Sequence, residues 1–201
     1  MKKILAVLTI ASALLLSGCS QSNEAASVGG FKISQTDLQA TIDAVVAERT
    51  KVDSSQMQLE TGDELNRGQL RFKILMHTFD EIAKDLKIEI TSSQVEAKKA
   101  TITKSLGGAT ELPKNLVNAA IAQADFNTYV RAIIISEQIT SALAASGVAA
   151  EQVAAQLGQL LSKKAKELGV KINPRYGTWD VEAGDVVAAN VTGDAVAPTA
   201  K

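Results

Sequence analysis

The chain has 201 residues, with 21 Lys and Arg against 22 Asp and Glu, one His and one Cys. This balance provides no excess of positive charge for holding nucleic acid phosphates. A single Cys excludes an internal disulfide, and one Cys with one His cannot form a structural zinc site. The length fits one domain with an additional tail or tether.

The first segment has the features of an export signal. Two lysines precede an apolar run over residues 4–16, which is shorter than the roughly 20 residues that a membrane-spanning helix needs. The run ends in Leu16-Ser17-Gly18-Cys19, which resembles the lipobox of bacterial lipoproteins. This resemblance implies cleavage between Gly18 and Cys19 and attachment of lipid to the Cys19 thiol. The alternative is an ordinary secretory signal with an incidental cysteine.

A lipidated Cys19 places the protein in the bacterial cell envelope, anchored by acyl chains to the extracytoplasmic face of a membrane. Removal of residues 1–18 takes away two lysines and lowers the net charge from −1 to −3, so no basic patch adds to this anchor. Residues 19–26 are small and polar, and we predict that they form a lipidated tether.

The segments after the tether predict a short extended piece followed by helices. A β-like stretch over residues 28–33 contains a Gly pair typical of a turn, and Ser34 with Asp37 indicates a helix start. The apolar residues of this helix fall on one predicted face, at Leu38, Ile42, Val45 and Val46. Residues 52–66 are polar and predict a loop, and residues 72–86 predict a strongly amphipathic helix.

The second half of the chain predicts more helices, after a β-like connector over residues 87–90. Thr91 and Gln94 match a capping box, and Pro113 suits the first turn of a short helix. Asp125 is predicted to cap the next helix, which carries two apolar faces and should therefore be enclosed by neighbours. One face consists of Phe126, Tyr129, Val130, Ile133 and Ile134, and the other of Ile135, Ile139 and Leu143.

The last predicted helix covers residues 153–168 and is closed by Gly169. Residues 170–180 are expected to be extended, and residues 182–201, which are small and acidic, to form a disordered tail. The expected fold class is therefore mainly α. We predict one helical domain over residues 27–181, with short strands at its two ends that pair and close it.

No catalytic site is predicted. His77 has Asp80 and Glu81 at helical spacing, but no nucleophile accompanies them, and a surface histidine is the favoured interpretation. The acidic residues after position 180 lack the spacing of a calcium loop. We therefore expect no metal, no cofactor and no enzymatic activity.

Binding of unfolded chains requires apolar surface that tolerates many sequences, and Met and aromatic side chains suit this role. The candidates for such contacts are Met57, Leu59, Met76, Phe79, Phe126 and Tyr129. Met57 and Leu59 lie in a polar segment, which favours exposure. For Met76, Phe79 and Phe126, a place in the core is the favoured interpretation.

Four segments, taken in order, resemble the N-terminal domain of SurA-type periplasmic chaperones and of the related PrsA-type lipoprotein foldases. They are VGGFKIS with Asp37-Leu38 (28–38), LKIEITSSQV (86–95), FNTYVR with IISE (126–137) and INPRYGTWD (172–180). The chain departs from the family in having Gly29 where an Asn is usual, and in lacking the parvulin isomerase domain that many members carry.

This resemblance implies a SurA-like helical domain and a lipoprotein chaperone that holds unfolded exported polypeptides without ATP. Its partners are then newly secreted chains and, through Cys19, the membrane. A second hypothesis is a structural or adaptor lipoprotein with one dedicated envelope partner. A third, a peptidyl-prolyl isomerase, requires catalytic groups that the sequence does not reveal.

Overall fold

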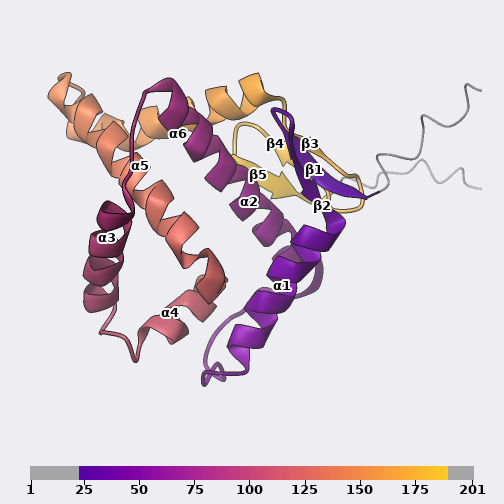
Figure 1. The fold of residues 1–201 in the computed structure, drawn as a ribbon. Helices are drawn as coiled ribbons and strands as arrows, with labels where there is room; N and C mark the ends of the chain where they lie inside the picture. Colours follow the sequence, from indigo (N-terminus) through magenta and orange to yellow (C-terminus); the bar gives the residue numbers. More distant parts are fainter. Residues whose placement is uncertain (1–22, 190–201) are drawn as a thin grey trace, which may run out of the picture.

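The computed structural model describes residues 23–189, and this part of the chain is mainly helical, as predicted (Figure 1). Within it, the helices are α1 (Gln35–Arg49), α2 (Gly62–Asp85), α3 (Ser92–Ser105), α4 (Leu112–Asn118), α5 (Phe126–Ala145) and α6 (Ala150–Leu168), with a single 3-10 turn η1 (Gln123–Asp125). The strands are β1 (Glu24–Val28), β2 (Phe31–Ser34), β3 (Lys171–Ile172), β4 (Thr178–Asp180) and β5 (Asp185–Val187).

The two ends of the described chain meet in a three-stranded antiparallel sheet of order β2-β1-β3. Gly29 and Gly30 form the β1–β2 turn with φ of 57° and 94°, which L side chains rarely adopt. A Cβ at Gly29 would lie 2.6 Å from a methyl carbon of Leu168, the last residue of α6. The predicted pairing of terminal strands is thus present, in the register Ala26 to Ile172.

Strand β1 begins at Glu24, inside the range predicted to be tether, so that prediction is wrong for residues 24–26. Ala25 and Ala26 are buried because β1 is the central strand, paired with β2 on one side and β3 on the other. Small side chains fit such a position, but they carry too little hydrophobicity to reveal it. The folded part therefore starts before residue 27.

The tail prediction for residues 182–201 is also wrong where the structure describes them. Strand β5 pairs with β4, and the side chain of Val186 is buried. The Asp180 Oδ1 atom accepts hydrogen bonds from the backbone N–H groups of Glu182 and Ala183, at 2.9 and 3.0 Å, and so shapes the turn. Acidic residues that look solvated in the sequence here stabilise a hairpin.

Local signals predict most helix ends correctly. Ser34 Oγ accepts from the Asp37 N–H at 2.9 Å, and Thr91 with Gln94 makes the reciprocal capping box. Two details differ from prediction. Asp125 makes no side-chain cap because it ends the 3-10 turn in helical geometry, and residues 87–90 form a turn and connector without a strand.

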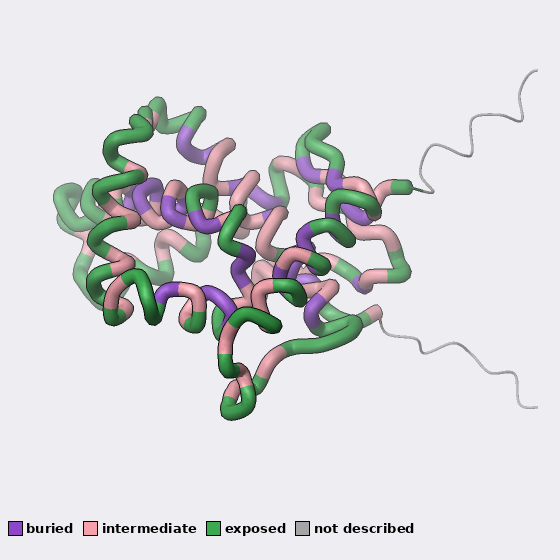
Figure 2. Tube along the Cα trace, turned by 60° about the horizontal axis from the view of Figure 1, so that its bottom comes forward, coloured by how far each residue is buried: buried purple, intermediate pink, exposed green. Residues whose placement is uncertain are grey.

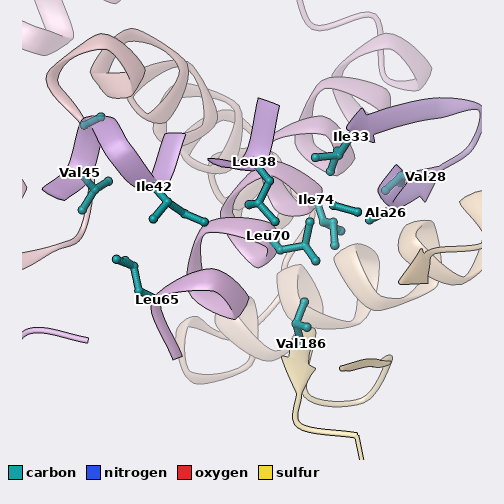
Figure 3. Packing of buried hydrophobic residues seen from close by; sticks show 12 residues of the cluster. Ala26, Val28, Ile33, Leu38, Ile42, Val45, Leu65, Leu70, Ile74 and Val186 are labelled. Carbon is teal, nitrogen blue, oxygen red and sulfur yellow. The ribbon is translucent and has the colours of Figure 1, made fainter. Parts of the chain in front are cut away.

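Helix α2 begins at Gly62, ten residues before the start expected from the apolar pattern. It runs through the middle of the fold, in contact with α1, α5, α6, β1 and β5 (Figure 1). Its early apolar residues join α1 in the largest core cluster, where Leu65 lies on the side of Ile42 and Val45, and Leu70 lies beside Leu38 (Figure 3). The last apolar position of α1, Val46, is 46% exposed, so that part of the predicted face points outward.

Helix α5 joins two further core clusters through its two predicted faces. Phe126, Val130 and Ile134 pack with α4, whereas Ile135 and Ile139 pack with the C-terminal half of α2 and with α6. The buried stretches of the chain lie mostly towards the inside of the molecule, and most of the outer loops are exposed (Figure 2). The double apolar face therefore correctly predicts a central position for α5.

Candidate functional site

Two of the larger hollows on the surface adjoin the middle of helix α2. The first, which we call the α6 hollow, has a volume of about 480 Å³ and lies between α2, α6 and the β4–β5 hairpin. Its apolar wall consists of Leu75, Ala155, Leu161, Ala165 and Trp179. Most of these side chains are half-buried, so apolar surface remains available within the hollow.

The second, which we call the α4 hollow, has a volume of about 400 Å³. It lies between α2, the end of α1, the loop before α2 and the segment that links α4 to α5. Its apolar wall consists of Leu59, Phe72, Leu75, Met76, Ile121 and Tyr129. Polar groups at this hollow include Arg49, Glu60 and Gln69, and the Gln69 amide nitrogen donates to the Ala120 carbonyl at 2.8 Å.

Arg71 and Leu75 line both hollows. They are one helical turn apart, so they form a ridge of α2 with one hollow on each flank. We call the two hollows and this ridge the groove. The Arg71 Nε atom donates to the Gly184 carbonyl at 3.3 Å and lies 3.6 Å from an oxygen of Asp185, which holds the hairpin turn beside the groove.

A glycine lines each hollow. Gly158 of α6 has no heavy atom within 4 Å of the position where a Cβ would be, so its place is open space in the α6 hollow. Gly68 of α2 lies under the carboxylate of Glu60, which would be 2.6 Å from a Cβ there. The first glycine therefore leaves room for an occupant, whereas the second allows the preceding loop to approach α2.

The predicted contact residues divide into those that the groove includes and those that it does not. Leu59, Met76 and Tyr129 come together in the α4 hollow. Met57 and Phe79 are half-buried and line neither hollow; Phe79 packs against the cluster that contains Ile82. Phe126 is 1% exposed and belongs to the core, so the structure corrects this candidate.

Sequence reasoning misses the whole α6 hollow, including Leu75 and Trp179. From the sequence, residues 170–180 are expected only to be extended and residues 153–168 only to form a helix, so neither segment is expected to border a binding surface. Just one residue of α6, Ala165, is buried. The available signal is the strong amphipathicity of α6, whose apolar face the fold covers only in part.

Two side chains at the groove carry buried N–H groups that find no acceptor among residues 23–189. They are the Nε and Nη2 atoms of Arg49 at the α4 hollow and the Nε1 atom of Trp179 at the α6 hollow. Buried donors without partners are uncommon in folded proteins, so each of them requires an explanation.

His77 lies outside the groove. Its ring stacks on Phe31 with centroids 4.4 Å apart, and burial is the main cause that lowers the His77 pKa below its ordinary value of 6.5. The neighbouring carboxylates have other partners, since Asp80 binds Arg131 at 2.8 Å and Glu81 binds Lys84. The Lys84 hydrogen bond lowers the Glu81 pKa. The three groups therefore do not assemble into an acid–base pair.

Cys19 and Gly18, the predicted lipidation and cleavage residues, lie outside the described residues. Across residues 23–189, no helix is both long and apolar enough to span a bilayer. In the same range, no group of three or more His, Cys, Asp or Glu side chains is arranged to hold a metal ion. Comparison of the chain with protein-family models, with curated proteins and with solved structures finds no match.

Proposed function

We propose that this chain is a lipid-anchored chaperone of the cell envelope that holds unfolded exported polypeptides in the groove without ATP, on a SurA-like helical domain. The observation that carries the proposal is the pair of adjoining apolar hollows on the two flanks of the Arg71–Leu75 ridge. An extended segment that crosses this ridge can place apolar side chains in both hollows.

The size of the two hollows, about 480 and 400 Å³, fits the reversible binding of two or three side chains. Burial of one large apolar side chain contributes about 1.5–3 kcal/mol, so two or three inserted side chains contribute about 3–9 kcal/mol before costs. Association and ordering of the segment oppose this by at least about 4 kcal/mol. The net binding free energy is therefore at most about 5 kcal/mol, which corresponds to a Kd of roughly a few hundred micromolar or weaker and allows release without an energy source.

The anchor is supported by the sequence around Cys19 and places the groove where exported chains emerge. The sequence reveals no recognisable set of catalytic groups, so we propose holding without isomerase chemistry.

The proposal is tested with the chain from residue 20 onward and a chemically unfolded client that aggregates on dilution. Light scattering should fall as the protein is added, to the same extent with and without ATP. Unchanged scattering at a several-fold molar excess of the protein would refute holding.

A second candidate is an adaptor lipoprotein that uses the groove for one dedicated partner. It is favoured by the division of the apolar surface into two compact hollows, because promiscuous binding is usually associated with broad apolar patches. Capture of a single stoichiometric partner from envelope extracts, together with no binding of varied unfolded peptides, would decide for the adaptor.

A further inference from the structure

The α4 hollow contains a charged group without a counterion among residues 23–189. The Nε and Nη2 atoms of Arg49 form one edge of its guanidinium, both are buried, and neither has an acceptor within that range. Arg49 is the last residue of α1, so its positive charge is attracted to the negative C-terminal end of the helix dipole. That long-range attraction does not provide an acceptor for the two N–H groups.

The acidic side chain that lines the same hollow does not pair with Arg49. Glu60 lines the same hollow, but its carboxylate lies over Gly68, and no ion pair links it to Arg49 in the described part of the chain. The other arginine of the groove, Arg71, already binds the Gly184 carbonyl and Asp185. Of these two arginines of the groove, Arg49 is thus the one whose guanidinium edge has no partner among residues 23–189.

The edge made by Nε and Nη2 is suited to the two oxygens of a carboxylate, which it can bind through two parallel hydrogen bonds. We propose that the groove recognises an extended polypeptide segment in which an Asp or Glu side chain stands beside apolar residues, with the carboxylate bound by Arg49. This inference rests on the proposed function and specifies the client. Since both nitrogens are covered in the structure, the neighbouring side chains must turn aside when the carboxylate enters.

Trp179 favours a polypeptide over a lipid as the occupant. Its Nε1–H group, at the α6 hollow, is a second buried donor with no acceptor among the described residues. A polypeptide presents a carbonyl acceptor next to every apolar side chain, whereas a hydrocarbon chain presents none. Arg49 lines only the α4 hollow, so an occupant of both hollows crosses the Arg71–Leu75 ridge and presents its carboxylate on the α4 side. We assign this carboxylate to an internal acidic side chain, and the experiment below separates it from a free C-terminus.

The experiment compares two peptides, acetylated and amidated at their ends, in which a Glu or a Gln is flanked by Leu and Phe. Affinities for the full chain, purified in detergent, are measured by fluorescence anisotropy. The Glu peptide should bind roughly tenfold more tightly than the Gln peptide, because a hydrogen bond to a charged group is the stronger one. Higher salt should reduce the difference only modestly if the pair is buried.

Arg49→Met keeps the length of the side chain and removes the charge. It should abolish the preference for Glu, so that the two peptides bind with similar affinity, and it should not lower the melting temperature, because a buried unpaired charge is removed. Arg49→Lys keeps the charge without the planar edge and should retain only part of the preference.

Each outcome bears on a defined claim. Equal binding of the two peptides by the wild type overturns the role of Arg49 and leaves the holding function intact. A preference for Glu that persists in Arg49→Met likewise overturns the role of Arg49 and leaves the holding function intact. Absence of binding by both peptides overturns the proposed function together with this inference. A preference seen only when the carboxylate is the free C-terminus, or displacement of bound peptide by micellar fatty acid alone, refutes the internal acidic side chain as the recognised group.

Discussion

Replacement of Gly158 by Phe tests whether the α6 hollow binds clients. Gly158 lies within α6 and lines the α6 hollow, and a Cβ at this position would have no neighbour within 4 Å, so a larger side chain can start into the hollow without a clash at its Cβ. A Phe side chain brings roughly 150–250 Å² of surface, enough to occupy a large part of a 480 Å³ hollow. The substitution therefore competes directly with an inserted client side chain.

The same substitution should not damage the fold. Gly is about 1 kcal/mol worse than Ala within a helix, and Phe lies about midway between them, so the helix gains about 0.5 kcal/mol. Partial burial of the ring can add about 1 kcal/mol. The melting temperature should thus stay the same or rise by about 2–6 °C. Gly158→Ala is the matched control, since it gains helix propensity while leaving most of the hollow open.

The assay is suppression of client aggregation together with peptide affinity, measured for wild type, Gly158→Ala and Gly158→Phe. Loss of one inserted side chain, worth about 1.5–3 kcal/mol, should weaken binding by roughly 10- to 100-fold in Gly158→Phe only. A folded Gly158→Phe protein that holds clients as well as the wild type does would refute the assignment of the groove.

Three further predictions concern the anchor, the hairpin and the histidine. Cys19→Ala should abolish incorporation of radiolabelled fatty acid and release the protein from the membrane fraction; persistent labelling would contradict the lipobox assignment. Gly177→Ala should destabilise the protein by about 2 kcal/mol or more in urea denaturation, because Gly177 has φ of 125° and a Cβ there would lie 2.1 Å from the Val187 carbonyl oxygen. Burial holds the folded-state pKa of His77 below its unfolded value of 6.5, so the unfolded state binds the extra proton as the pH falls. The stability contributed by the neutral ring should therefore be full above about pH 6.5 and decline below it. His77→Phe can still stack on Phe31 and has no group to protonate, so its free energy of unfolding should fall less below about pH 6.5 than that of the wild type. Parallel curves of stability against pH for the two proteins would contradict this.

Helix positions are predictable because their signals are local. The capping box of Thr91 and Gln94 and the left-handed Gly169 after α6 depend on neighbours within four residues. The two faces of α5 are also predictable, because the spacing of apolar residues along a helix indicates which of its sides are covered by neighbours. The short strands β1 and β5 escape prediction because five and three residues are too few to show such a periodicity. Pairing orders them, β1 with its neighbour β2 and the distant β3, and β5 with β4 in a hairpin.

The groove is predictable only in part. Residue type identifies Leu59, Met76 and Tyr129, and the structure brings them into one hollow. Phe126 has the same chemical character, yet it is buried, because position in the fold and not side-chain type decides exposure.

The sequence by itself determined the helical class and the ends of most helices, and it predicts export and lipidation at Cys19, since each of these depends on adjacent residues. Only the tertiary structure decided which apolar faces remain open beside α2, that Trp179 and Leu75 border the same hollow, and that Arg49 lacks a partner among the described residues. These features arise where α2 meets α6 and the β4–β5 hairpin on one flank, and the end of α1 with the α4–α5 link on the other. The residues that meet there are up to 113 positions apart, as in the Arg71–Gly184 hydrogen bond, and no local pattern encodes such a meeting.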